Sequence, residues 1–346
     1  MDSFMERLPE ELVAYIFDHL QAAHALSTAM VVNRQWYMFG ARNLHSRLVL
    51  GLGFDLTLES SETVVCLMKR LVSPTLPSAH LIRHLVIYGL ARPDVQSLIL
   101  DILRRATGLR SLDMHSLHCL HSESLFPPDA VSAQDLLPSI VALNVASAPF
   151  IAALAHTRRL HALRVHDPMD HAALSRLAHE NGNFVNTIQS LELAVSIDSP
   201  GAAVEEMAYL ASALRNAPLR ALALQFVLGR PGLMSWSDFE DVIGRMGPLL
   251  RTFPDLSIVS LVIRPDPIMP SIASGEVGSG EEQRERMTRR LAERLIADNS
   301  LTRLTRIELR WHGWTVHGGA LSALSRSEFL RLPQNWTYQQ HAASVH

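Results

Sequence analysis

Apolar residues near the amino terminus recur with the period of an α-helix. They occupy every fourth position, at Leu8, Leu12, Ile16 and Leu20, so they lie along one face of a helix. A helix this short is marginal alone and must bury that face against another part of the chain or against a partner. The pattern that follows predicts two more short helices before residue 45.

A second pattern begins after residue 79. An apolar residue is followed by two others, a second apolar residue, one other and a third apolar residue. The triplets are Ile82/Leu85/Ile87, Leu109/Leu112/Met114, Ile140/Leu143/Val145, Leu160/Leu163/Val165, Ile188/Leu191/Leu193, Leu219/Leu222/Leu224, Ile258/Leu261/Ile263 and Leu304/Ile307/Leu309. Such triplets also arise by chance in an apolar chain, but most successive starts are roughly 20 to 30 residues apart, near the period of a repeat protein.

Amphipathic helical stretches separate the triplets. They span residues 94–106, 171–180, 203–216, 238–250 and 281–299. Short strands that alternate with helices favour parallel strands joined by crossover helices and stacked as a solenoid. The sequence therefore predicts an α/β fold, in which residues 80–346 form a solenoid and residues 46–79 form a linker or a cap on the first repeat.

Composition narrows the class of protein. Hydrophobic residues make up 48% of the 346 residues and charged residues 19%, as in a globular protein with a large core. The formal net charge of −3 gives no electrostatic reason to expect nucleic acid or an anionic membrane as a partner. No apolar run reaches the length of a membrane span. Two cysteines cannot make a disulfide framework, and no basic-then-apolar leader follows Met1, so we expect an intracellular protein of the cytoplasm or the nucleus.

The first 45 residues carry apolar and aromatic residues at the spacing of a known module. These residues are Leu8, Pro9, Leu12, Ile16, Phe17, Leu20, Leu26, Val31, Arg34 and Trp36. The stretch resembles the F-box, and the chain looks most like fungal F-box proteins with divergent repeats behind the box. Val31 stands where the family often has cysteine, but both side chains are small and apolar.

The F-box resemblance implies a substrate-receptor subunit of an SCF-type cullin ubiquitin ligase, which is not itself an enzyme. In that family the box packs against a Skp-type adaptor protein, which links it to the cullin. Carried over position by position, the adaptor-binding residues are Leu8, Pro9, Leu12, Ile16, Leu20, Leu26, Val31 and Trp36. Each fully buried aliphatic side chain contributes roughly 1.5–3 kcal/mol, so a handful suffices for a stable complex. The alternative is that residues 1–45 cap the first repeat, because a solenoid needs a cap with a polar outer side.

The repeats resemble leucine-rich repeats in the strand signature alone, since they lack the asparagine or cysteine that usually follows the strand. In such strands the residues that alternate with the central apolar pair face the concave surface, so we expect them to form three exposed columns. Small residues dominate these positions in the middle repeats, and charges collect at the ends. The residues predicted to contact a substrate protein are Arg164, Glu192, Arg264, Arg306 and Arg310. Three of these arginines, at 264, 306 and 310, would suit a phosphate. The alternative is that the small residues only fit a tightly curved solenoid.

Possible metal ligands concentrate in one stretch, which contains Asp113, His115, His118, Cys119 and His121. Zinc would accept cysteine and histidine, but no second cluster at a recognised spacing completes a site. The glycine-rich residues 275–280 are acidic and contain no lysine to meet a phosphate, and no serine stands in a nucleophile-elbow pattern. We therefore predict no catalytic residue, no cofactor and no metal.

Three functions compete from the sequence. The first is a receptor that recruits a substrate protein for ubiquitination, and the second is a repeat scaffold that binds partners without degradation. The third is a cryptic hydrolase or metalloprotein, which bound zinc in the purified chain would reveal. Three of the five tryptophans lie near the carboxyl end, at Trp311, Trp314 and Trp336. They form either an aromatic cap on the last repeat or a recognition surface, since tryptophans often anchor interfaces.

Overall fold

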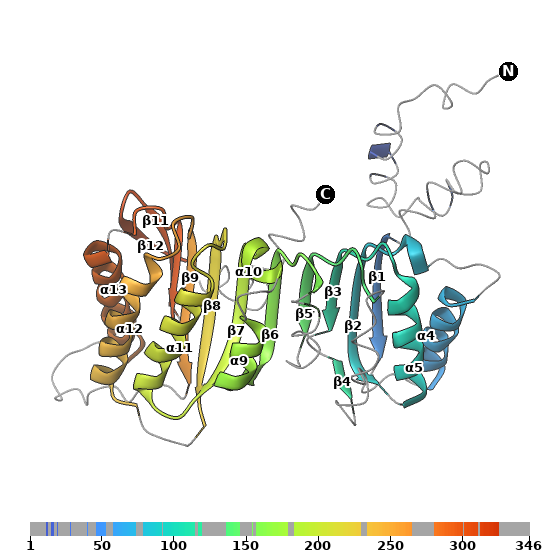
Figure 1. Cartoon of the computed structure of the whole chain (residues 1–346), viewed down its shortest axis with the longest axis horizontal. Helices are drawn as coiled ribbons and strands as arrows, with labels where there is room; N and C mark the ends of the chain where they lie inside the picture. The colour runs from blue at the N-terminus through green and yellow to red at the C-terminus, as the bar shows by residue number, and fades with distance from the viewer. Residues whose placement is uncertain are drawn as a thin grey trace. The chain divides into compact units, whose positions relative to one another are not determined.

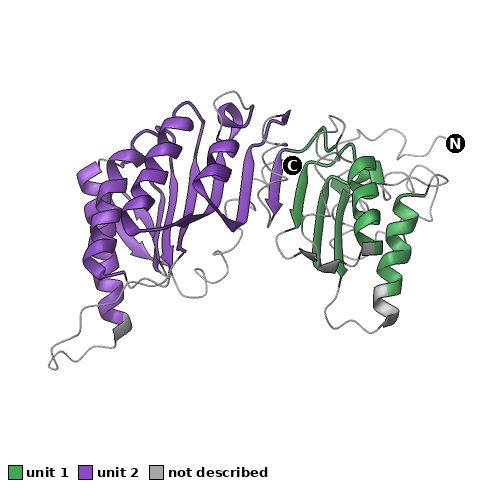
Figure 2. Ribbon diagram, turned by 60° about the horizontal axis from the view of Figure 1, so that its bottom comes forward, with its two compact units in different colours: residues 1–140 green, residues 141–346 purple. Residues whose placement is uncertain are grey.

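The computed structural model describes most of the chain after residue 45 and a few isolated residues before it. The described stretches are residues 46–52, 58–73, 79–91, 93–114, 117–119, 136–145, 157–178, 183–229, 234–264, 280–299, 301–310 and 312–324. The chain divides into two compact units, unit 1 (Met1–Ile140) and unit 2 (Val141–His346), which Figure 2 shows in different colours.

Unit 1 contains a parallel sheet with helices on one face. Its elements are β1 (Arg47–Leu52), α4 (Leu58–Leu71), the 3-10 helix η2 (Ala79–Leu81), β2 (His84–Ala91), α5 (Pro93–Arg105), β3 (Ser111–Met114) and β4 (Leu117–Cys119). β1 pairs with β2, β2 pairs with β3, and the end of β2 pairs with β4, all in parallel. α4 and α5 lie side by side on one face of these strands (Figure 1).

Unit 2 repeats the same arrangement over more strands. Its strands are β5 (Ala142–Val145), β6 (Ala162–Met169), β7 (Ser190–Ile197), β8 (Ala221–Leu228), β9 (Ile258–Arg264), β10 (Arg306–Leu309), β11 (His312–His317) and β12 (Ala320–Ala323). β5 to β10 pair in chain order and in parallel, whereas β11 and β12 add to β10 as antiparallel strands. The described helices are α9 (His171–Leu177), α10 (Asn183–Thr187), α11 (Pro200–Ala213), α12 (Trp236–Leu250) and α13 (Gly280–Asn299). α11, α12 and α13 stand in a row on one face of the sheet (Figure 1).

The core of unit 2 lies between the sheet and this row of helices. The central apolar residues of successive triplets are register partners, as Leu191 is with Leu222 and Leu193 is with Leu224. These side chains are 0–1% exposed. Each fully buried leucine stabilises the fold by roughly 1.5–3 kcal/mol, so the continuous aliphatic columns hold neighbouring repeats together.

A ladder of backbone hydrogen bonds fixes where each strand of unit 2 begins. The carbonyl oxygen of the residue before one strand accepts N–H groups from two residues of the next repeat. The Gln189 carbonyl, for example, accepts from Arg220 (2.8 Å) and Ala221 (3.0 Å). The carbonyls that do this are those of Val141, His161, Gln189, Arg220 and Ser257. Ser257 adds its hydroxyl to the Arg220 carbonyl at 3.0 Å, so polar backbone groups at this edge are satisfied between repeats.

The predicted α/β class and the mostly parallel sheet are confirmed. The five predicted helices correspond to α5, α9, α11, α12 and α13, with ends that differ by up to three residues. The largest shift at an amino end is in α11, which begins at Pro200 because the Ser199 side chain accepts a hydrogen bond from the Ala202 N–H and so caps the helix. Residues 46–79 contain β1 and α4, a strand and a helix like those that follow.

One predicted triplet is wrong by two residues. In the observed register Val259 and Leu261 of β9 align with Leu222 and Leu224 of β8. Leu256 begins this triplet, since its N–H donates to the Phe253 carbonyl at 3.2 Å as part of the turn before the strand. Ile258 misled the prediction because it is apolar and 8% exposed although it lies on the opposite face of β9.

Candidate functional site

Two of the predicted adaptor-binding residues, Leu12 and Ile16, are described, and both are helical. Leu12 is 50% exposed and the neighbouring Tyr15 is 62% exposed, while the ring of Tyr15 lies 4.3 Å from that of His19. Leu12 and Tyr15 are therefore exposed large hydrophobic side chains among the few residues described in this part of the chain. The other predicted contacts lie outside the described residues, namely Leu8, Pro9, Leu20, Leu26, Val31 and Trp36.

Three residues predicted to contact a substrate, Arg164, Glu192 and Arg306, lie on the face of the unit 2 sheet opposite the described helices, which we call the helix-free face. A row of register partners crosses this face through Asn144, Arg164, Glu192, Ala223, Ser260 and Glu308. The guanidinium of Arg164 pairs with the carboxylate of Glu192 on the next strand at 2.8 Å. Their side chains are 5% and 18% exposed, so this ion pair is largely removed from water.

A second ion pair occupies the β10 end of the row. Arg306 donates to the carboxylate of Glu308 two residues later on the same face, and both side chains are buried. Burial raises the pKa of the Glu308 carboxyl above its ordinary value, while the positive charge of Arg306 and hydrogen bonds from Arg306 and Ser260 oppose this rise. A buried carboxylate stays charged only where such partners repay its desolvation, so the Arg306–Glu308 pair acts as a unit.

The remaining two predicted residues have different environments. Arg264 is exposed at the end of β9. Arg310 follows β10 and is 4% exposed, with a backbone φ of 61° that side-chain-bearing residues rarely adopt. Its N–H donates to the Leu261 carbonyl at 2.9 Å, and this bond ties the turn to β9.

The residues that alternate with the central apolar pair were predicted to be exposed, and this prediction is wrong at the first two such positions of the unit 2 strands. Ala142, Ala162 and Ala223 are 0%, 1% and 7% exposed, and Asn144 is fully buried. The amide oxygen of Asn144 lies 2.9 Å from the His166 imidazole, a contact that the sequence did not predict because it depends on strand register. The helix-free face therefore consists of small buried residues and paired charges, with Arg264 as the exposed cation among the predicted contacts.

The stretch in which possible metal ligands concentrate is described only in part. Asp113 is 7% exposed on β3, while His115 and His121 lie outside the described residues. Among the side chains that the structure describes, no three histidine, cysteine, aspartate or glutamate residues gather closely enough to hold a metal ion.

Of the tryptophans near the carboxyl end, Trp314 is buried on β11. Trp311 and Trp336 lie outside the described residues. The position of Trp314 in the strand that pairs with β10 favours a structural role for this tryptophan.

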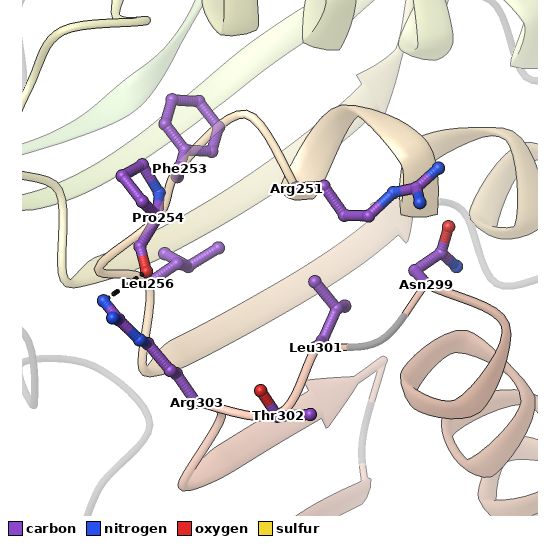
Figure 3. Close-up of a pocket in the computed structure, with 8 residues that line it drawn as sticks. All are labelled: Arg251, Phe253, Pro254, Leu256, Asn299, Leu301, Thr302 and Arg303. Atoms are coloured by element: carbon purple, nitrogen blue, oxygen red, sulfur yellow. Dashed lines mark hydrogen bonds between the residues drawn. The ribbon is translucent and has the colours of Figure 1, made fainter.

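The sequence did not predict a cavity at the edge of unit 2 where the strands begin. Eight residues line it: Arg251, Phe253, Pro254, Leu256, Asn299, Leu301, Thr302 and Arg303 (Figure 3). They come from the end of α12, the turn before β9, the end of α13 and the turn before β10. No sequence pattern links these segments, because the packing of α12 against α13 brings them together.

The described helices include none that is both long and apolar enough to cross a membrane. Comparison of the chain with models of known protein families and with curated proteins finds no match to either.

Proposed function

We propose that the protein is a substrate receptor of an SCF-type cullin ubiquitin ligase. In this proposal residues 1–45 are an F-box that docks a Skp-type adaptor, and the strand–helix repeats are a leucine-rich-repeat-like solenoid that binds a substrate protein. The observation that carries the proposal is the F-box spacing of the amino-terminal residues together with the exposure of Leu12 (50%) and Tyr15 (62%), which are both helical.

The exposed helix face supports docking over a purely internal role. A helix that only capped the first repeat would bury its apolar face against that repeat. Leu12 and Tyr15 instead remain half or more exposed, as expected for an interface that a partner covers. Burial of a few such side chains at roughly 25 cal/mol per Å² is enough for a stable complex once association costs are met.

The experiment is co-purification of the full chain with a Skp-type adaptor, wild type against the double variant Leu12→Asp/Ile16→Asp. Two carboxylates in an apolar interface cost several kcal/mol, on the order of 2–7 for each polar group left unpaired, so we expect the variant to lose the adaptor. A matched control is Ala208→Asp/Ser212→Asp, which places the same charges at the same spacing on the exposed face of α11 and is expected to retain it.

Each outcome decides the proposal. Retention of the adaptor by the control and loss by the Leu12/Ile16 variant, with unchanged circular dichroism, supports docking through this helix. A folded wild type that does not bind the adaptor rejects the proposal. Unfolding of the variant assigns these helices to the solenoid as its cap. Binding to the adaptor without cullin-dependent loss of any partner favours a repeat scaffold.

A further inference from the structure

The cavity at the strand-start edge of unit 2 has an apolar floor. Phe253, Leu256 and Leu301 form this floor and are 3%, 4% and 9% exposed. The cavity volume is about 260 Å³, below the roughly 300–1,000 Å³ of sites for small-molecule ligands. Its size and lining therefore suit one apolar side chain of a partner better than a cofactor.

A buried amide stands at the side of this floor. Asn299 ends α13 and is 6% exposed, and its side-chain N–H donates to the Leu295 carbonyl at 2.9 Å. Gly247 of α12 packs directly against the amide, which fixes its orientation. Among the described residues no group donates to the amide oxygen of Asn299, and this residue lines the cavity (Figure 3). A fixed acceptor beside an apolar floor suits the backbone N–H of a bound chain.

The rim of the cavity is basic. Arg251 and Thr302 are exposed on opposite sides of it, and the guanidinium of Arg303 pairs with Asp255 at 2.7 Å. The exposed Arg251 side chain makes no hydrogen bond or ion pair with any residue that the structure describes. The positive charge of Arg251 interacts favourably with the dipole at the carboxyl end of α12. The guanidinium N–H groups remain available to donate to a carboxylate.

A further arginine lies one strand away. The Arg220 carbonyl accepts the N–H of Ser257 at 2.8 Å, and Ser257 directly follows Leu256 of the floor. The Arg220 side chain is exposed and, within the described parts of the chain, also forms no ion pair. Arg251 and Arg303 thus line the cavity and Arg220 stands at the start of the next strand, while the described carboxylates of Asp255 and Asp298 belong to neighbours of lining residues in the sequence.

We propose that this cavity binds a segment of a partner protein in which one apolar side chain is flanked by carboxylates. The apolar side chain enters between Phe253, Leu256 and Leu301, its backbone N–H donates to the Asn299 amide oxygen, and the flanking carboxylates pair with Arg251 and Arg220. The described rim offers no exposed aromatic ring on which a nucleobase would stack, which favours an acidic protein segment over nucleic acid. This inference goes beyond the proposed function, because it holds whether or not the chain binds an adaptor.

The test measures binding of a fluorescein-labelled peptide, Glu-Asp-Glu-Leu-Glu-Asp-Glu, to the full chain by fluorescence anisotropy at low salt. We expect Arg251→Glu to weaken binding by about tenfold or more, because attraction becomes repulsion. Replacement of the leucine of the peptide by serine removes the contact with the floor and is expected to weaken binding about fivefold or more.

A matched control is Arg245→Glu, which makes the same charge change two turns earlier on α12. Arg245 is exposed, pairs with Asp241 at 3.5 Å and does not line the cavity, so its substitution is expected to change the affinity by less than about twofold. Circular dichroism of all variants establishes that each chain is folded.

Four results would overturn the proposal. The first is a folded wild type that does not bind the peptide. The second is equal weakening by Arg245→Glu, or equal affinity for the serine peptide, which reports general attraction of acidic chains. The third is tighter binding of a single-stranded oligonucleotide of equal charge that displaces the peptide. The fourth is self-association of the chain in light scattering that Arg251→Glu abolishes, which makes a second copy the occupant.

Discussion

Two glycines of α12 test how closely α12 and α13 approach each other. Gly244 is exposed, and a Cβ atom added there would meet no atom within 4 Å. Gly247 is buried, and a Cβ atom added there would overlap the Asn299 amide, at 2.7 Å from Cγ, and would lie 2.9 Å from Leu295 Cδ1. The substitutions Gly244→Ala and Gly247→Ala therefore make the same chemical change on the same helix in opposite surroundings.

The expected energies follow from this difference. Replacement of glycine by alanine inside a helix gains about 0.5–1 kcal/mol, since the unfolded chain loses conformational freedom. For Gly244→Ala we expect this gain alone. For Gly247→Ala an overpacked interface costs about 1–3 kcal/mol, and the following Pro248 disfavours a helical backbone for a residue that has a Cβ atom. We therefore expect Gly247→Ala to destabilise unit 2 by about 1–2 kcal/mol.

Urea unfolding followed by tryptophan fluorescence measures both changes, because Trp236 and Trp314 are buried in unit 2. The double variant Gly247→Ala/Asn299→Ala removes the amide that the new methyl group would overlap, so it is expected to lose less than the sum of the two single variants. If Gly244→Ala and Gly247→Ala stabilise unit 2 equally, the close packing of α12 on α13 is refuted, and with it the fixed orientation of Asn299.

Two further predictions concern other contacts. Gly89→Ala is expected to lower the free energy of unfolding of unit 1 by at least about 1–3 kcal/mol. The reason is that Gly89 has a φ of 105° and that a Cβ atom there would overlap the Leu52 carbonyl. An unchanged urea midpoint in circular dichroism would contradict the observed approach of β1 to β2. A hydrogen bond and charge attraction from Glu206 raise the pKa of His171 above 6.5, so the stabilisation from this pair is complete below about pH 6.5 and is lost as the pH rises through the folded-state pKa. Glu206→Gln is expected to lower that pKa in an NMR titration of the imidazole, and an unchanged pKa would show that the pair does not form in solution.

The strands could be predicted from the sequence wherever one face of a strand is apolar and the other is not. β7 meets this condition, since Leu191 and Leu193 alternate with Ser190 and Glu192, and its register with β8 is as predicted. β9 does not, because Ile258 on the helix-free face is as apolar as Val259 on the core face. A period of two residues then leaves the start of the pattern ambiguous, and only the neighbouring strands determine it.

The burial and the ion pairing of the predicted contact residues could not be predicted from the alternation of apolar and polar positions. Strand alternation predicts that Arg164 and Arg306 line an open surface, and arginine is usually exposed. The burial of Arg164 depends on the carboxylate of Glu192, which strand pairing brings close, whereas that of Arg306 depends on Glu308, two residues along the same strand. The cavity beside Arg251 was missed for a related reason, since the sequence gives no signal for how close two helices approach.

The hydrogen-bond ladder at the strand starts determines where the chain of unit 2 can change in length. Each step of the ladder holds only the residue before a strand and the first residue of that strand. The ladder does not constrain the number of residues in the connection between two strands, and the connection from β6 to β7 is shorter than that from β9 to β10. Insertions between a strand and the turn that leads to the next one therefore leave the pairing intact, because longer loops add little entropic cost. A single-residue insertion between the turn and the strand would instead turn every side chain of that strand to the other face. Insertions and deletions in related sequences are thus expected after the strands and not at the residues that directly precede them.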